Sequence, residues 1–492
     1  MIRIKCLCLL LFLIISGLPL LAQDAEPSWL NKKILKLENS PDIETPSSNL
    51  IKNRIVNTIN LSDLAEENLT LPYYYWSWSK IEDLTSKIDS IYLEPKVQLR
   101  ELIVSVLLSE MPANIEIPKE ANLYIARLNK LLELGQYKEA QTFININDPN
   151  LTLSFQQQFE LNLLKGNDTL ACSQSKIQGT NNNTLKQKIY CLNHEGKQSE
   201  ARIVFETAKI LTKIKDYDTY IIELLLNSKE FAQSYIIDNK NNLSILDYII
   251  LQKNDIKIED KFIPTSYLFY NLSQTYDIEK KLIISEKLAK FGIISNLQLF
   301  KFYKESDIVN DKALIKRKKC VNELELSILK QSSDDIRKNL VKCLSLFQKI
   351  GLSSDFSRYY RTTLLAEVNT GWETPTSVKM RLLSKDYSSL KIELTENSNF
   401  NSAQSIARNN FTKLNGLTAF EKSIIDAFKD PKYKDHNASL IDQGKIGEVI
   451  ISSIILLESE DLNKMQNGLT ALIQAGLTDV ARDIAIRILI ES

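Results

Sequence analysis

Glycine or asparagine recurs at an almost constant interval through the middle of this sequence, each time five residues before an alanine. The four turns and their alanines are Gly135 with Ala140, Gly166 with Ala171, Gly196 with Ala201, and Asn227 with Ala232. Successive turns lie 31, 30 and 31 residues apart. Gly and Asn tolerate the left-handed backbone that ends a helix, and a small Ala early in the next helix lets antiparallel helices approach closely. The spacing therefore predicts one helical hairpin per repeat.

The hairpins are expected to stack, because apolar clusters precede each turn and a single hairpin cannot bury them. The same spacing returns near the end of the chain, from Gly476 to Ala481. Only 13 glycines and 12 prolines occur in 492 residues, so the strongest helix breakers are scarce. The sequence predicts an all-α fold, specifically an α-solenoid of antiparallel helical hairpins with a period of about 31 residues.

Two resemblances accompany this pattern. Leu134-Gly-Gln-Tyr-Lys-Glu-Ala140 resembles the turn and second-helix start of a tetratricopeptide repeat, G-x-Y-x-x-A. Residues 123–140, the two-cysteine segment 171–196 and the closing residues 473–485 resemble a family of exported alphaproteobacterial proteins of unassigned function. The second resemblance implies a periplasmic location and brings no known activity.

The first residues are typical of a secretory signal peptide. Arg3 and Lys5 precede an apolar run from Cys6 to Ile15, and a small residue, Ala22, ends the segment. We expect cleavage after Ala22, with an uncleaved anchor as the alternative because Leu20 is large for its place before the cleavage site. No later run approaches the roughly 18 apolar residues of a membrane span. The sequence thus predicts an exported protein without stable transmembrane insertion after signal cleavage.

Turn clusters divide the chain into consecutive segments. The predicted segments are a signal peptide (1–22), an N-terminal helical segment (23–120), tetratricopeptide-like repeats (121–240), degenerate helical repeats (241–370) and C-terminal helical repeats (371–492).

Four cysteines follow the signal peptide: Cys172, Cys191, Cys320 and Cys343. An even number in an exported protein favours disulfides. Evident turns lie midway between the first two cysteines and midway between the last two, and an antiparallel hairpin brings residues equidistant from its turn to the same height. We therefore predict bonds from Cys172 to Cys191 and from Cys320 to Cys343. A metal site is the alternative, but the chain holds only two histidines, His194 and His436, and has no C-x-x-C motif.

An aromatic cluster, Tyr73-Tyr74-Tyr75-Trp76-Ser-Trp78, has the most unusual composition in the chain. On an α-helix Tyr74 and Trp78 would share a face, so the rings can dock as a plug on the first hairpins. The alternative is an exposed platform for a sugar, a peptide or a lipid surface. If exposed, these five aromatic side chains would form the best candidate surface for a ligand or partner.

Motifs of the common catalytic classes are absent from the sequence, which contains no G-x-S-x-G, H-E-x-x-H, Walker loop or dinucleotide fingerprint. Lys and Arg total 61, as do Asp and Glu, so no net charge favours nucleic acid. We expect a protein that is not an enzyme, needs no cofactor or metal, and acts as a periplasmic scaffold for an unidentified envelope protein or peptide. The alternative function is an envelope polysaccharide-handling protein or enzyme, acting on peptidoglycan, with a superhelical domain.

Overall fold

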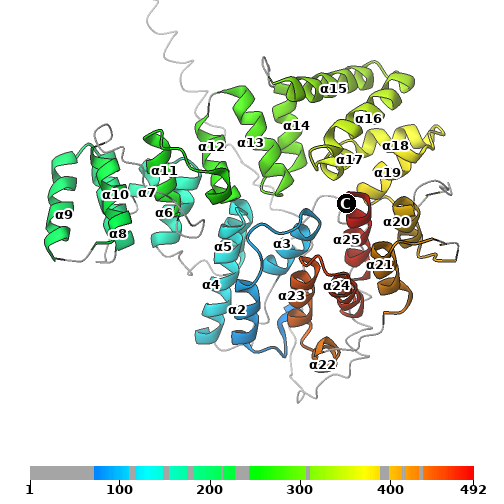
Figure 1. Ribbon diagram of the computed structural model, residues 1–492, viewed down its shortest axis with the longest axis horizontal. Coiled ribbons are helices and arrows are strands. Elements are labelled where there is room, and N and C mark those ends of the chain that lie inside the picture. The colour runs from blue at the N-terminus through cyan, green and yellow to red at the C-terminus, as the bar shows by residue number, and fades with distance from the viewer. Residues whose placement is uncertain are drawn as a thin grey trace, which may run out of the picture. The chain divides into compact units, whose positions relative to one another are not determined.

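The computed structural model describes most of the chain after residue 70 (Figure 1). The described residues are 71, 73–109, 117–147, 155–173, 182–211, 214–227, 243–275, 277–305, 311–387, 390, 398–412, 414, 416–431 and 436–491. Within these ranges every regular element is an α-helix or a short 3-10 helix. The predicted all-α fold of packed helical hairpins is confirmed.

The N-terminal part of this region and the repeats that follow are built from short helices. The N-terminal elements are η2 (Tyr73–Trp76), α2 (Ile81–Asp89), η3 (Val97–Leu99) and α3 (Arg100–Leu108). The repeat helices are α4 (Ile117–Glu133), α5 (Tyr137–Asn147), α6 (Phe155–Leu164), α7 (Asp168–Ser173), α8 (Asn182–His194), α9 (Gln198–Leu211), α10 (Asp216–Leu226) and α11 (Ile245–Lys253).

The remaining helices continue the series to the C-terminus. The middle elements are η5 (Asp260–Phe262), η6 (Thr265–Tyr267), α12 (Leu268–Gln274), α13 (Ile278–Lys290), α14 (Asn296–Glu305), α15 (Lys312–Leu329), α16 (Ser333–Gln348), α17 (Ser353–Tyr359) and α18 (Arg361–Asn369). The last elements are α19 (Pro375–Leu383), α20 (Ser398–Arg408), α21 (Ala419–Lys429), α22 (His436–Asp442), α23 (Ile446–Leu457), α24 (Leu462–Gln474) and α25 (Thr478–Glu491).

The glycine turns adopt the conformation that the repeat pattern predicts. Each of four glycines lies between two helices with a positive φ: Gly135 (75°), Gly166 (70°), Gly196 (76°) and Gly476 (85°). The alanines five positions later are buried at 0–1% exposure: Ala140, Ala171, Ala201 and Ala481. The small side chains therefore lie in the helix contacts, where a larger residue would separate the two helices.

Asn227 departs from this pattern. It ends α10 with φ −129° and ψ 38°, which is not the left-handed conformation expected of it. Its side chain explains the difference, because Asn227 Nδ2 donates to Glu223 Oε2 (2.7 Å) and Asn227 Oδ1 accepts from Arg202. Asn227 thus closes its helix through side-chain hydrogen bonds rather than through a left-handed turn. Its partner in the pattern, Ala232, lies outside the described residues.

Two local features of the C-terminal part agree with its sequence. Thr418 and Glu421 form a reciprocal capping box at the start of α21. The apolar run from Val449 to Leu457 belongs to α23, which is buried along most of its length. Within the region that the structure describes, no helix is both long and apolar enough to cross a membrane.

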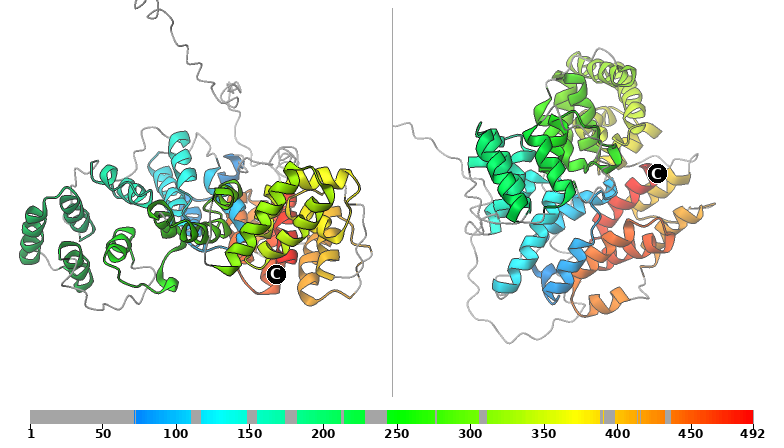
Figure 2. Two further views of the ribbon diagram at one scale, coloured as in Figure 1. Left: turned by 90° about the horizontal axis from the view of Figure 1, so that it is seen from above. Right: turned by 60° about the vertical axis from the view of Figure 1, so that its left-hand side comes forward.

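Helices from opposite ends of the described part of the chain lie side by side. Helix α23 packs against η2, α2 and α3, and α25 packs against η3 (Figures 1 and 2). Lys87 Nζ donates to Ser452 Oγ (2.8 Å), and the backbone N–H of Lys96 donates to both carboxylate oxygens of Glu458 (2.9 and 3.1 Å). The last helices therefore stabilise the N-terminal segment, a contact that the repeat pattern does not predict.

The buried apolar residues form three clusters. The largest takes residues from 71 to 143 and from 272 to 490, so the N-terminal segment and the C-terminal helices share one core. The second runs from Tyr137 to Tyr270, and a small third cluster lies within 189–226. The repeat helices from α6 to α11 are thus held mainly by a core of their own.

Candidate functional site

The structure joins the cysteines in the two pairs expected from the sequence. Cys172 on α7 is bonded to Cys191 on α8, with Cα atoms 5.3 Å apart. Cys320 on α15 is bonded to Cys343 on α16, with Cα atoms 5.7 Å apart. The turn between α15 and α16 contains Gln331, whose φ is 53°, at the position expected for the hairpin midpoint. Each bond closes one helical hairpin.

The aromatic cluster is divided between the core and the surface. Tyr75 and Trp76 are both 2% exposed, whereas Trp78 is 41% exposed with φ 67°. Tyr73 and Tyr74 lie in the same 3-10 helix, η2. Because η2 ends at Trp76 and Trp78 has a left-handed backbone, the expectation of one α-helical face shared by Tyr74 and Trp78 is wrong. Of the three side chains of the cluster that the structure describes, Tyr75, Trp76 and Trp78, only Trp78 offers an exposed ring.

A buried arginine fixes the inner half of this cluster. Arg127 of α4 is fully buried and stacks its guanidinium on the rings of Trp76 (4.9 Å) and Phe143 (4.6 Å). Its Nε donates to the carbonyl of Leu107 (2.9 Å), and another N–H donates to the carbonyl of Ser109. Trp76 Nε1 in turn donates to Ser109 Oγ (2.8 Å). Burial lowers the pKa of Arg127 to about 9. These contacts make Trp76 a packing residue rather than a ligand surface.

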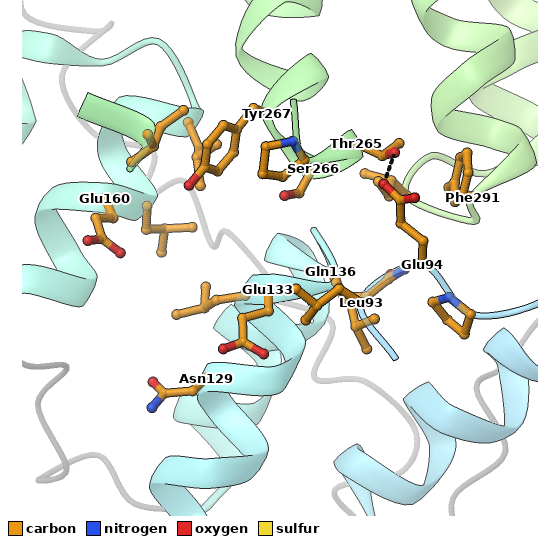
Figure 3. A pocket seen from close by; sticks show the side chains of 18 of the residues that line it. Leu93, Glu94, Asn129, Glu133, Gln136, Glu160, Thr265, Ser266, Tyr267 and Phe291 are labelled. Carbon is orange, nitrogen blue, oxygen red and sulfur yellow. Dashed lines mark hydrogen bonds between the residues drawn. The ribbon is translucent and has the colours of Figure 1, made fainter. Parts of the chain in front are cut away.

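The best candidate for a binding site is a hollow of about 450 Å³ where the two larger cores meet (Figure 3). Its walls come from the loop before η3, from α3, α4 and α6, and from the segment around η6. Leucine and isoleucine side chains make most of the floor, with Tyr267 and Phe291 on the side of η6. An apolar hollow with a few polar groups at its edge is the usual form of a ligand or peptide site.

Hydrogen bonds hold the wall around η6 in place. Tyr267 Oη donates to the carbonyl of Leu243 (2.9 Å), and Tyr137 Oη donates to the carbonyl of Ser266 (3.2 Å). Thr265 Oγ1 donates to Glu94 Oε1 (2.9 Å), which ties η6 to the N-terminal segment (Figure 3). The hollow is therefore preformed by segments that are far apart in the sequence.

Three carboxylates and one guanidinium line the hollow. Glu94, Glu133 and Glu160 come from three different segments, and Figure 3 shows Glu160 on one side of the hollow with Glu133 on the other. The guanidinium of Arg100 already has partners within the protein. It donates to the carbonyl of Pro95 and lies over the Phe291 ring at 4.3 Å. Burial lowers the pKa of Arg100 to about 9. The carboxylates dominate the charge that the hollow presents.

Glu160 is the acid most affected by its surroundings. Burial raises its pKa; a hydrogen bond from the Gln156 amide (3.1 Å) opposes that shift, and the negative charge of Asp247 adds to it. Glu133 is more open, at 49% side-chain exposure, and pairs with Lys130 (2.9 Å). A cation entering the hollow would stabilise the ionised Glu160 carboxylate by charge attraction and so offset the cost of its burial.

The structure gives no support to a metal role for the histidine near Cys191. Cys172 and Cys191 are bonded to each other, and His194 Nε2 lies 3.4 Å from Thr169 Oγ1 while its ring stacks near Tyr190. Among the residues with described positions, no three His, Cys, Asp or Glu side chains are grouped to hold a metal ion.

Sequence reasoning missed the hollow and its acids. Glu94, Glu133 and Glu160 belong to no motif, and they are three among 61 acidic residues. The only local signal was the turn at Gly135, since Gln136 beside it lines the hollow and donates to the carbonyl of Gly292 (3.0 Å).

Comparison with known proteins gives one short similarity. A stretch of 112 residues is 35% identical to the mRNA 3′-end-processing protein RNA14 of the fungus Eremothecium gossypii. The stretch covers 20% of this chain and 17% of the length of that protein, too little to show a shared family. No protein-family model matches the chain, and no solved structure matches it. The resemblance to exported alphaproteobacterial proteins stays a prediction.

Proposed function

We propose that this protein is a periplasmic helical-repeat scaffold that binds a segment of another envelope protein in the hollow between α3, α4, α6 and η6. The observation that carries the proposal is the hollow itself, which combines an apolar floor with carboxylates at its edge. Helical-repeat proteins commonly use such concave surfaces to hold extended partners. Binding without chemistry fits a chain whose sequence has none of the common catalytic motifs.

The proposed compartment is supported by the disulfides. Two bonded pairs at buried positions form and persist in oxidising surroundings such as the periplasm. The predicted signal peptide, 1–22, lies outside the described residues. Fractionation of cells that express the full chain, followed by N-terminal sequencing, would test export and cleavage after Ala22 together.

Capture of a partner would test the scaffold function. Asn129 is an exposed residue of α4 at the edge of the hollow, so Asn129→Trp should obstruct it without disturbing the core. Asn322→Trp makes the same change at an exposed position of α15, away from the hollow. We expect in-cell crosslinking to recover one stoichiometric partner with the wild type and Asn322→Trp, and to lose it with Asn129→Trp. Equal recovery with all three chains would contradict the proposal.

A second candidate function is the cleavage of an envelope glycan, and Glu160 is the observation that favours it. A carboxyl group whose pKa is raised by burial can serve as a general acid in glycoside cleavage. Incubating the full chain with purified peptidoglycan would test this candidate. Release of muropeptides by the wild type, abolished in Glu160→Gln, would favour glycan cleavage over the scaffold function. No release by the wild type would contradict glycan cleavage.

A further inference from the structure

A second hollow continues the first along the same helix. It measures about 730 Å³ and lies between α2 and α4, where Ile125 and Asn122 of α4 face Ile81 and Thr85 of α2. Asn129 lines both hollows, so the two are adjacent at this residue. Ile125 is 43% exposed, and Leu93 in the first hollow is 44% exposed. Exposed apolar side chains thus accompany both hollows, which is a common feature of protein-binding surfaces.

The second hollow is acidic as well. Its charged lining residues are Glu82 and Asp89, and none of the described residues that line it is Lys, Arg or His. Together with Glu94, Glu133 and Glu160, they give five carboxylates along α4 and its neighbours, against two cations, Arg100 in the first hollow and Lys130, which pairs with Glu133. This local excess is specific to the surface, because the whole chain has 61 acidic and 61 basic residues. Charge of one sign in a concave surface selects partners of the opposite sign.

The length of the surface fits a short extended segment. From Asn122 to Glu133 the helix advances 11 residues, or roughly 16 Å at the rise of an α-helix. An extended chain covers about 3.3 Å per residue, so about five residues would run from one hollow to the other. A single small amine would fill only part of this surface.

We propose that the two hollows form one acidic groove along α4, and that it binds an extended segment of a partner protein in which lysine or arginine adjoins an apolar side chain. This inference rests on the proposed scaffold function and gives the chemistry of its partner. The apolar side chain enters the first hollow beside Leu132 and Tyr267, and the cation lies between Glu133 and Glu160. A further cation pairs with Glu82 or Asp89 in the second hollow.

A peptide array would test this chemistry directly. The probes are immobilised nine-residue peptides in which each position is scanned through all amino acids, incubated with the full oxidised chain. We expect the wild type to select Lys or Arg next to Leu, Ile, Phe or Tyr. The Glu133→Gln/Glu160→Gln variant should bind the selected peptides roughly fivefold to thirtyfold more weakly than the wild type. Added salt should lower its peptide affinity less than it lowers that of the wild type. Glu200→Gln, an exposed residue of α9, is the matched control and should bind as the wild type does.

A second variant keeps the test independent of any single site. Glu82→Gln/Asp89→Asn changes only exposed side chains of α2 and should also weaken binding of peptides with two cations. A selection without Lys or Arg, or affinities unchanged in both double variants, would overturn the cationic groove while leaving the scaffold function standing. An array that yields no peptide distinguishing the wild type from Asn129→Trp would instead contradict the scaffold function itself.

Discussion

Two glycine turns with the same backbone and different surroundings allow a direct test of the hairpin packing. Gly135 and Gly196 have φ of 75° and 76°, so replacement by Ala forces the same left-handed conformation on both. A Cβ on Gly196 would meet no atom within 4 Å, whereas a Cβ on Gly135 would lie 3.0 Å from both Ile293 Cδ1 and Ser266 Cβ. The comparison therefore isolates the contact between the first repeat turn and the η6 wall of the hollow.

The expected magnitudes follow from these two terms. The left-handed conformation costs a non-glycine residue about 1–2 kcal/mol, partly offset by the lower entropy of the unfolded Ala chain. Gly196→Ala should therefore lower the free energy of unfolding by about 1 kcal/mol. Gly135→Ala adds overpacking of about 1–3 kcal/mol, because the carbonyl of Ser266 is hydrogen-bonded to Tyr137 and resists displacement. We expect a total loss of about 2–4 kcal/mol for Gly135→Ala.

Urea unfolding followed by circular dichroism would measure the free energy of unfolding of both variants. No reducing agent is added, so that the disulfides stay intact. A lower midpoint at unchanged m-value would report a change in stability alone. If Gly135→Ala and Gly196→Ala lower the midpoint equally, the first turn does not pack on η6 as the structure has it. Equal losses would also remove the argument that this turn supports the wall of the hollow.

Four further variants test other parts of the structure. The double variant Cys320→Ser/Cys343→Ser should lose about 3 kcal/mol of stability, and alkylation with mass analysis should find both thiols protected in the native wild type. Trp76→Ala should cost about 3–5 kcal/mol in chemical unfolding because the ring is buried, whereas Trp78→Gly, at an exposed left-handed position, should cost nothing or stabilise. Burial raises the pKa of Asp355 to about 6, above its unfolded value of 3.8, so its contribution to stability is full below about pH 4 and is lost as the pH rises to about 6. The urea midpoint of Asp355→Asn should consequently fall less than that of the wild type between pH 4.5 and pH 7.

The candidate site illustrates how far sequence reasoning reaches. The composition of the aromatic cluster made it a candidate site, but composition did not predict which rings are exposed. Trp76 and Trp78 differ in exposure because η2 ends at Trp76 and Trp78 has a left-handed backbone. Neither feature has a local signal as clear as glycine. Glu133 and Glu160 carried no signal at all, since an acid on a helix is usually solvated and only the arrangement of several helices makes a hollow around it.

The backbone conformation at two turns was equally hard to predict for the same reason. Gln331 and Lys385 adopt positive φ although neither is Gly or Asn. Gln331 is constrained by the hairpin of α15 and α16, which a disulfide closes. Lys385 is held by ion pairs from its side chain to Glu101 (2.7 Å) and Asp483 (3.4 Å). In both cases the surrounding structure imposes a backbone that the residue itself does not favour.

The sequence by itself determined the helical hairpins, the positions of their glycine turns and the pairing of the cysteines. These features depend on residues within about 25 positions of one another, where turn chemistry and helical periodicity act directly. Only the tertiary structure decided that Glu458 caps the backbone of Lys96, that the two ends of the described chain share a core, and that acids from separate segments line one groove. Such contacts depend on the angles between successive hairpins. Each angle is set by the packing of many side chains, and the angles accumulate along the chain, so no single motif determines them.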